Sequence, residues 1–282
     1  MSKIKIAELF YSIQGEGRYM GVPSVFLRTF GCNFKCAGFG MPKGQISTEA
    51  DTIAINIQQY KTYEELPLTT TGCDSYASWH PDFKDLSPML TTDAIADRCR
   101  DILPGGVWSD AHLVITGGEP LLGWQRSYPD LLTHPFMADL KEITFETNGT
   151  QELSASFYNF LRGWVAQDPQ REITFSVSPK LSISGEAHDE AIQPKIVTEY
   201  QDVGYTYLKF VVAHDTDIEE IRKVVEEYRA EGFKGPVYLM PCGGVETVYG
   251  ANNRAVAEMA MREGWRYSDR LQVPLFKNEW GT

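Results

Sequence analysis

The sequence has no long apolar run and no strongly basic segment. No stretch approaches the roughly eighteen consecutive apolar residues of a membrane-spanning helix, so we expect no membrane partner. Its first residues, MSKIKIAELFYSIQGEG, lack an apolar segment of signal-peptide length, which predicts a cytoplasmic protein. Acidic residues outnumber basic residues 38 to 26, for a net charge of −12. Since nucleic-acid binding needs a basic surface, we expect no nucleic-acid partner and favour a small-molecule function, although acidity can also serve solubility alone.

The cysteines do not form a disulfide framework. There are five, and an odd number in a reducing compartment argues against paired thiols. Cys32 and Cys36 lie close together beside glycine, which points to metal or redox chemistry. Cys99 lies on a predicted amphipathic helix and is expected to be a buried thiol. Cys242 follows an apolar strand, and the sequence assigns it no role.

Short β-rich runs alternate with helical stretches along most of the chain. We predict strands over residues 24–30, 111–118, 142–149, 172–179, 205–212 and 235–241. We predict helices over residues 91–103, 154–166, 216–231 and 252–263. This alternation predicts an α/β fold with a mainly parallel sheet, either open or closed into a barrel. Ligands of such sheets gather at the carboxyl ends of the strands, where TGGEP, ETNGT and SPK are found.

The 37–72 segment differs from the rest of the chain. It is rich in threonine, has only a modest apolar patch (IAINI), and does not continue the strand and helix alternation. We interpret it as an insertion between two chemically related segments. The expected organisation is therefore a single domain over residues 1–282, with the insertion at 37–72.

A third cysteine follows this segment. Thiolates are the soft donors that iron–sulfur clusters use, and a loop carrying Cys32 and Cys36 could wrap one edge of such a cluster. The CxxxC spacing alone is equally compatible with two unrelated buried thiols. However, the two cysteines directly follow a predicted strand, and TGCDSYASW supplies Cys73 followed by an acid and a hydroxyl residue. A cluster with three protein thiolates keeps one iron open to another ligand.

Several motifs together resemble one family. They are ELFYSIQGEGRYMGVPSVFLRTFGCNFKC at 8–36, CDSYASW at 73–79, TGGEPLL at 116–122, FETNGT at 145–150, SVSPKL at 176–181 and LKFVV at 208–212. The chain resembles the 7-carboxy-7-deazaguanine synthases, which are radical S-adenosylmethionine (SAM) enzymes. The resemblance covers most of the sequence outside the 37–72 segment. It implies a partial, open TIM-like barrel of mainly parallel strands, with a [4Fe–4S] cluster, SAM and Mg²⁺ as cofactors.

The cluster loop departs from the family pattern. Radical SAM enzymes usually carry CxxxCxxC, but the third position here is Phe39. Because Cys73 has the sequence context of the family's third cysteine, the resemblance implies that Cys32, Cys36 and Cys73 hold the cluster. The residue before the third cysteine, often an aromatic that packs near the adenine, is Gly72. Adenine contacts must then come from elsewhere, and the 37–72 segment is one source.

The resemblance implies a set of substrate-binding residues: Ile13, Gln14, Gly15, Glu16, Arg28 and Thr116. A glutamine and a carboxylate in a glycine-flanked turn can bind the donor and acceptor edge of a pterin. A polar β-turn without function is the alternative for this turn. Arg28 matches the family's substrate arginine, whose guanidinium fork suits a carboxylate, and a structural salt bridge is the alternative.

The resemblance also assigns cofactor contacts. For SAM these are Gly118 and Glu119 of TGGEP and Ser178, Pro179 and Lys180 of SPK. Ser75 stands where the family has a threonine that contributes its hydroxyl to Mg²⁺, a cation that prefers hard oxygen ligands.

The activity implied is conversion of 6-carboxy-5,6,7,8-tetrahydropterin to 7-carboxy-7-deazaguanine with loss of ammonia. A 5′-deoxyadenosyl radical would remove a hydrogen from the substrate, and ring contraction would follow. The implied partners are this pterin, an electron donor of the flavodoxin or ferredoxin type, and a second copy of the chain in a homodimer. Two alternatives remain: another radical SAM reaction on a small molecule or a protein, and a degenerate, non-catalytic homologue, which Phe39 favours.

Overall fold

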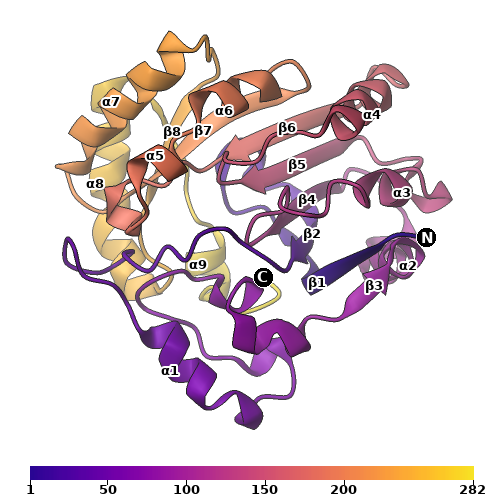
Figure 1. Cartoon of the computed structure of the whole chain (residues 1–282), viewed down its shortest axis with the longest axis horizontal. Coiled ribbons are helices and arrows are strands. Elements are labelled where there is room, and N and C mark those ends of the chain that lie inside the picture. The colour runs from indigo at the N-terminus through magenta and orange to yellow at the C-terminus, as the bar shows by residue number, and fades with distance from the viewer.

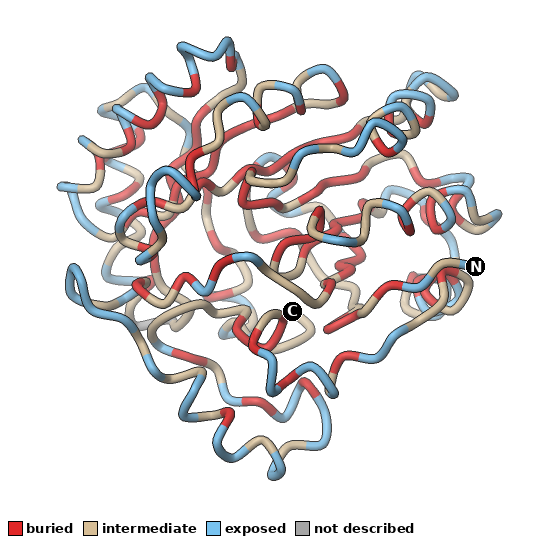
Figure 2. Tube along the Cα trace, in the orientation of Figure 1, coloured by how far each residue is buried: buried red, intermediate tan, exposed pale blue. Residues whose placement is uncertain are grey.

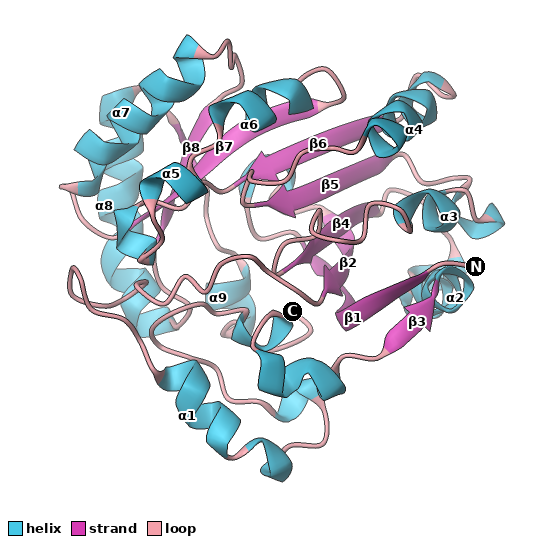
Figure 3. Ribbon diagram, viewed as in Figure 1, coloured by secondary structure: helices cyan, strands magenta, loops and turns pink.

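The protein is built on one open sheet flanked by helices (Figures 1 and 3). The computed structural model describes the backbone of residues 1–282 and the side chains of all of them except residues 246 and 247. The strands are β1 (Lys3–Ile13), β2 (Pro23–Thr29), β3 (Met89–Thr91), β4 (His112–Gly117), β5 (Glu142–Thr147), β6 (Glu172–Val177), β7 (Tyr205–Val212), β8 (Val237–Pro241) and β9 (Arg266–Tyr267). The helices are α1 (Glu49–Ile55), α2 (Thr92–Ile102), α3 (Tyr128–Leu132), α4 (Ala155–Ala166), α5 (His188–Ala191), α6 (Pro194–Tyr200), α7 (Asp217–Ala230), α8 (Glu246–Glu263) and α9 (Gln272–Phe276).

The sheet is mostly parallel. Within the described chain the strand order is β3-β1-β2-β4-β5-β6-β7-β8-β9, and the two edge strands do not pair with each other. Strand β1 is antiparallel to both β2 and β3, whereas every pairing from β2 to β9 is parallel. Parallel pairing requires crossover connections, and helices supply most of them. The predicted open α/β fold of mainly parallel strands is confirmed.

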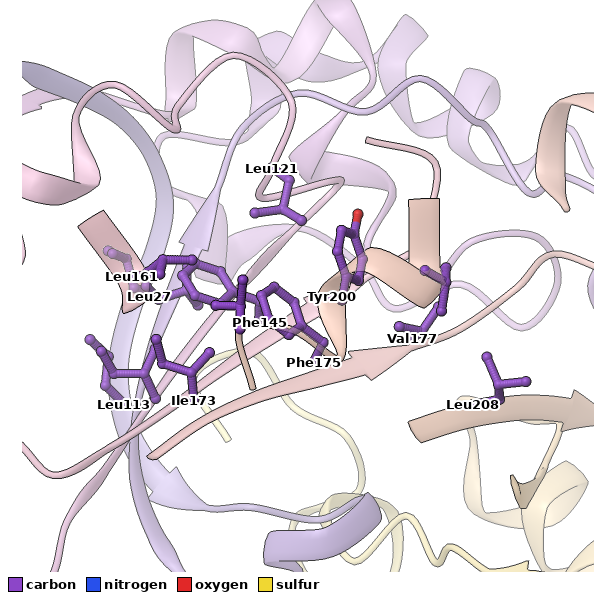
Figure 4. Packing of buried hydrophobic residues seen from close by; sticks show 14 of the residues in the cluster. Leu27, Leu113, Leu121, Phe145, Leu161, Ile173, Phe175, Val177, Tyr200 and Leu208 are labelled. Atoms are coloured by element: carbon purple, nitrogen blue, oxygen red, sulfur yellow. The ribbon is translucent and has the colours of Figure 1, made fainter. Parts of the chain in front are cut away.

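Alternation along the strands separates a core face from a polar face. Leu27, Phe145 and Phe175 point to one face and pack with residues of the covering helices, such as Tyr200 of α6 (Figure 4). Ile115 pairs with Leu27 and Phe145 in register and so lies on the same face. Because successive side chains point to opposite faces, their neighbours point to the other face. Figure 2 shows the strands as the most continuously buried part of the chain. The sheet therefore has one face committed to the core and one available for a site.

Helix ends follow the expected chemistry. Helix α2 begins after Thr91, whose hydroxyl oxygen accepts from the backbone N–H of Ala94 at 3.2 Å and so satisfies one free donor of the first turn. Cys99 of this helix is fully buried, as predicted. Helix α7 ends at Ala230, and Gly232 adopts a left-handed φ of 91° directly beyond it. No helix in the described part of the chain has both the length and the apolar content to cross a bilayer.

The 37–72 segment leaves the sheet and returns to the same point. It carries α1 and short 3₁₀ turns but no strand. The N–H of Gly72 donates to the carbonyl of Phe39 at 2.7 Å, which ties the end of the segment to its beginning. Figure 1 shows α1 of this segment at the lower edge of the molecule, apart from the other labelled helices. The excursion thus adds residues without moving its two ends apart.

Candidate active site

A cavity of about 260 Å³ opens on the polar face of the sheet, near the carboxyl ends of its strands. It is bounded by the β1–β2 turn, the cysteine loop, the TGGEP, ETNGT and SPK segments, and the last residues of the sequence. Most of the predicted site residues line it: Ile13, Gln14, Gly15, Glu16, Arg28, Cys32, Cys36, Cys73, Ser75, Thr116, Gly118, Ser178 and Lys180. Residues predicted from four separate motifs therefore meet in one place.

One end of the cavity, the thiol end, is formed by Cys32, Cys36 and Cys73. They pack with Phe34, Phe39 and Ala191 in a small apolar cluster. The bond between Gly72 and Phe39 explains how a cysteine so distant in sequence reaches this place, because Cys73 follows directly after it. Gly72 has a left-handed φ of 78°, which favours glycine at the position where the family often has an aromatic residue.

Burial governs the protonation of these thiols. It raises the pKa of Cys32 to about 12 and of Cys73 to about 11, and it raises the pKa of Cys36 well above its ordinary value. The ammonium group of Lys180 opposes this shift at all three thiols. Among the described residues, no three His, Cys, Asp or Glu side chains converge on a point that would hold a single metal ion. A four-iron cube spreads its thiolate ligands over separate corners, so it does not require such convergence.

Backbone contacts shape the thiol end. The N–H groups of Lys35 and Cys36 donate to Oε1 of Glu186 at 2.9 and 2.6 Å, and Cys36 adopts a left-handed φ of 50°. The N–H of Glu119 donates to the carbonyl of Gly31 at 2.8 Å. A Cβ on Gly118 would lie 2.4 Å from that carbonyl oxygen, so only glycine fits there. Glu186 was not predicted from the sequence, because an isolated glutamate in a loop carries no pattern.

The other end of the cavity, the charged end, contains paired ions. Glu16 forms an ion pair with Lys209, and its Oε1 accepts from Nε of Arg270 at 3.1 Å and from Nε2 of Gln272 at 2.8 Å. Nη2 of Arg270 also donates to Asp74 at 2.5 Å. Burial alone would raise the pKa of Glu16, but Lys209 and Arg270 outweigh it and lower that pKa to about 2. Glu16 is therefore a largely buried carboxylate, 14% exposed, that stays ionised.

A second ion pair at this end involves Arg28. Its Nε donates to Oε2 of Glu8 at 2.7 Å, and its Nη1 donates to the hydroxyl of Ser75 at 3.0 Å. The hydroxyl of Ser75 lies 3.4 Å from a carboxylate oxygen of Asp74. Two of the three guanidinium nitrogens of Arg28 are thus engaged within the described residues, and the pair with Glu8 is the salt bridge that the sequence left as the alternative to carboxylate binding. Of these partners, Glu8 carried no signal in the sequence.

Two predicted substrate residues, Gln14 of the β1–β2 turn and Thr116 of β4, are joined through Glu146. The side chain of Gln14 donates to Oε1 of Glu146 at 3.0 Å, and the hydroxyl of Thr116 donates to Oε2 of the same carboxylate at 3.1 Å. Residues 268–272 hold the turn from the other side, since the N–H of Leu271 donates to the carbonyl of Gly15 at 3.1 Å. The predicted residues of this turn therefore form a fixed edge of the cavity.

Two predicted cofactor contacts lie outside the cavity lining. Pro179 is not among the residues that border it in the described structure, and neither is Glu119. The Glu119 carboxylate is fully buried and accepts from Leu121 N at 3.0 Å, Thr147 Oγ1 at 2.8 Å and Asn148 N at 2.7 Å. Burial raises the pKa of Glu119 to about 7 although these donors oppose the shift. Its side chain orders the loops beneath the cavity, and its contact with a cofactor stays a prediction.

Comparison with known proteins identifies relatives over the whole chain. No protein-family profile matches the sequence. A 7-carboxy-7-deazaguanine synthase from Halobacterium salinarum is 31% identical over 98% of this chain and 91% of its own length. An enzyme of the same name from Rhodopirellula baltica is 29% identical over 100% of this chain and 90% of its own length. Another, from Pyrobaculum aerophilum, is 27% identical over 99% of this chain and 97% of its own length. The crystal structure of QueE from Escherichia coli matches 94% of this chain and 93% of its own, with a TM-score of 0.55 at 21% identity, a likeness of fold alone.

Proposed function

The chain belongs to the 7-carboxy-7-deazaguanine synthase family, and we propose that it converts 6-carboxy-5,6,7,8-tetrahydropterin to 7-carboxy-7-deazaguanine with loss of ammonia by radical SAM chemistry. One observation carries this proposal. A single cavity joins three cysteine thiols at one end to Arg28 and the turn containing Gln14 and Glu16 at the other. A reaction of this class needs both ends within one enclosed volume.

The thiol end suits a [4Fe–4S] cluster. Cys32, Cys36 and Cys73 are soft donors, and a cluster held by three thiolates would keep one iron open to a ligand that is not a protein side chain. When bound, the cluster and SAM supply a carbon radical that removes a hydrogen atom from the substrate. Gly118, Ser178 and Lys180 border the cavity and are the proposed SAM contacts, together with Glu119 and Pro179 of the same two motifs.

The charged end suits a carboxylated pterin. The amide of Gln14, which bonds Glu146 and the backbone N–H of Glu16, borders this end and would exchange these partners for the hydrogen-bonding edge of the ring. Ile13, Gly15, Glu16 and Thr116 also border it. Arg28 would bind the substrate carboxylate, either through Nη2 or by exchanging Ser75 for the ligand at Nη1. Glu8 would hold the guanidinium in place during this exchange, because it contacts Nε. Fixed placement of the reacting carbon and exclusion of water are the protein's own contribution to the rate.

The remaining parts of the proposal concern Mg²⁺ and partners. Ser75 and Asp74 present neighbouring oxygen atoms to the cavity, as a hard cation requires, and Ser75 is the proposed Mg²⁺ ligand. By membership of the family we also propose a homodimer, an electron donor of the flavodoxin or ferredoxin type, and a cytoplasmic location. The 37–72 segment is, in this proposal, an insertion within a single radical SAM domain.

An anaerobic assay of the reconstituted protein tests the reaction. With SAM, dithionite, Mg²⁺ and the tetrahydropterin, we expect 7-carboxy-7-deazaguanine by mass spectrometry. Arg28→Lys keeps the charge but loses the fork, so we expect kcat/KM to fall about 100-fold. Arg18→Lys, at an arginine paired with Glu172 outside the cavity, is the control and should retain activity. SAM cleavage that leaves the pterin unchanged would show that the substrate assignment is wrong.

A further inference from the structure

The 37–72 segment packs around a residue from the far end of the sequence. Tyr63 and Leu66 of this segment belong to an apolar cluster that also contains Tyr76 and Trp280. The ring of Trp280 meets those of Tyr63 and Tyr76 edge-on, with centroids 4.8 and 6.0 Å apart. Its Nε1–H donates to the carbonyl of Leu66 at 2.6 Å. Packing and a directed hydrogen bond therefore fix Trp280 against the segment.

The residue after Trp280 reaches the charged end of the cavity. The N–H of Gly281 donates to Oε1 of Glu8 at 3.0 Å, while Oε2 of Glu8 accepts from Nε of Arg28 at 2.7 Å. The side chain of Glu8 is 4% exposed, so both bonds are shielded from water. One buried carboxylate thus connects residue 281 to the arginine at the cavity. A change in the position of residue 281 changes the partners available to that carboxylate.

The path of the chain into this position is specific. After α9, Lys277 and Asn278 adopt left-handed φ values of 55° and 58°, which turn the chain back toward the cavity. Asparagine tolerates this conformation, but Lys277 adopts it at a cost, so contacts beyond the turn must offset it. The contacts of Trp280 and Gly281 do so. Residues 279–282 then form part of the cavity wall.

We propose that the 37–72 segment is a clamp for residues 279–282, and that Trp280 is a positioning residue for substrate binding. Held by the clamp, Trp280 keeps Gly281 on Glu8, and Glu8 then holds the guanidinium of Arg28 in the orientation that accepts a carboxylate. The inference rests on the proposed function, in which Arg28 binds the carboxylate of the substrate. It gives the segment a role in recognition that is separate from carrying Cys73 to the cluster loop.

The test compares two ligands and four proteins. The ligands are 6-carboxypterin and pterin, which differ only in the carboxylate, and their binding is followed by their fluorescence. Beside wild type, the variants are Trp280→Phe, which keeps a ring but loses the N–H donor, Trp280→Ala, which loses both, and Trp108→Phe as the matched control. Trp108 also donates from Nε1 to a backbone carbonyl, that of Phe136 at 3.1 Å, but it lies in the core away from the cavity. Hydrogen exchange of the peptide 277–282 and iron content are measured on the same samples.

We expect Trp280→Phe to speed exchange in the 277–282 peptide and to weaken 6-carboxypterin binding about tenfold, since one charge-assisted contact is misplaced. Pterin binding and iron content should stay at the wild-type level, and Trp108→Phe should change neither exchange nor selectivity. The positioning role would be overturned if Trp280→Phe weakened the binding of 6-carboxypterin and of pterin equally. It would also be overturned if exchange in the 277–282 peptide became faster while the affinity for 6-carboxypterin stayed unchanged. Unchanged exchange in Trp280→Phe and Trp280→Ala would overturn the clamp itself. If wild type binds neither pterin while exchange still depends on Trp280, the proposed function fails and the clamp stands.

Discussion

The two ends of the cavity differ in the charge state of their buried groups. At the thiol end, Cys32, Cys36 and Cys73 lie among apolar side chains, and burial keeps the pKa of each thiol high. At the charged end, Glu16 and Arg28 are also largely shielded from water, but each has an oppositely charged partner, so both remain ionised. A ligand at the first end must bring charge of its own, whereas a ligand at the second must exchange with existing ion pairs. The difference shows that one cavity can favour a metal cluster and a polar substrate in separate places.

The largest effect we predict comes from breaking the charged end. Arg270→Met removes the cation that joins Glu16 to Asp74 and leaves a carboxylate without its partner. We expect the free energy of unfolding to fall by about 3 kcal/mol, the lower end for a broken buried pair because Asp74 keeps contact with solvent. Urea denaturation of the reconstituted protein measures it. Arg254→Met, which breaks an exposed pair with Glu258, is the control and should cost about 0.5 kcal/mol or less. Equal losses in the two variants would contradict the role of Arg270.

A smaller effect is predicted at the thiol end. In Gly118→Ala the new Cβ would lie 2.4 Å from the carbonyl oxygen of Gly31 and 2.7 Å from Cβ of Cys32. The cysteine loop must move, so we expect a loss of about 2 kcal/mol and less iron bound per chain after reconstitution. Gly163→Ala in α4 meets nothing within 4 Å and should instead add about 0.5 kcal/mol. Full iron binding by Gly118→Ala would show that the loop does not depend on this close approach.

The smallest effect we predict is on the pH dependence of stability, and it comes from His112. Unlike Glu16, this buried group forms no ion pair within the described residues. His112, at the start of β4, is buried, and burial lowers its pKa to about 3 from an ordinary 6.5. Between these values the unfolded chain binds a proton that the folded chain does not. Stability is therefore lost as pH falls from 6.5 toward 3, by about 1.5 kcal/mol between pH 6.5 and 5. His112→Gln should flatten that part of the profile in denaturation experiments. Parallel profiles for the two proteins would mean that His112 is not buried as a neutral ring.

Periodicity in the sequence predicted six of the nine strands described, and no predicted range covers β1 or β3. The strand predicted at 205–212 has both bounds correct, and the other predicted strands differ from β2, β4, β5, β6 and β8 by one or two residues at one or both ends. The helix predicted at 252–263 begins instead at residue 246, because the Gly250–Asn253 stretch hides the helical pattern. Helix α6 was missed since its seven residues are too few to show a period. Strand β9, with two residues, is set by pairing with β8 and not by its own sequence.

The site was predictable where residues form motifs and not where they act alone. The turn with Gln14 and Glu16, the cysteines and the TGGEP segment all carry local patterns, and the structure brings most of them to one cavity. Arg270 carries none. Its partners Asp74 and Glu16 lie 196 and 254 positions away, a distance that no local pattern spans. A buried Glu16 required a cation, and that requirement was the one physical signal that could have prompted a search for Arg270.

The central claim is that Cys73, and neither Cys99 nor Cys242, completes the three-cysteine site with Cys32 and Cys36. Iron content and product formation of Cys73→Ala, measured anaerobically beside wild type and Cys99→Ala, test it most directly. We predict that Cys73→Ala loses both the cluster and 7-carboxy-7-deazaguanine formation, whereas Cys99→Ala, altered within the core on α2, keeps both. Retention of four irons and turnover by Cys73→Ala would contradict the account.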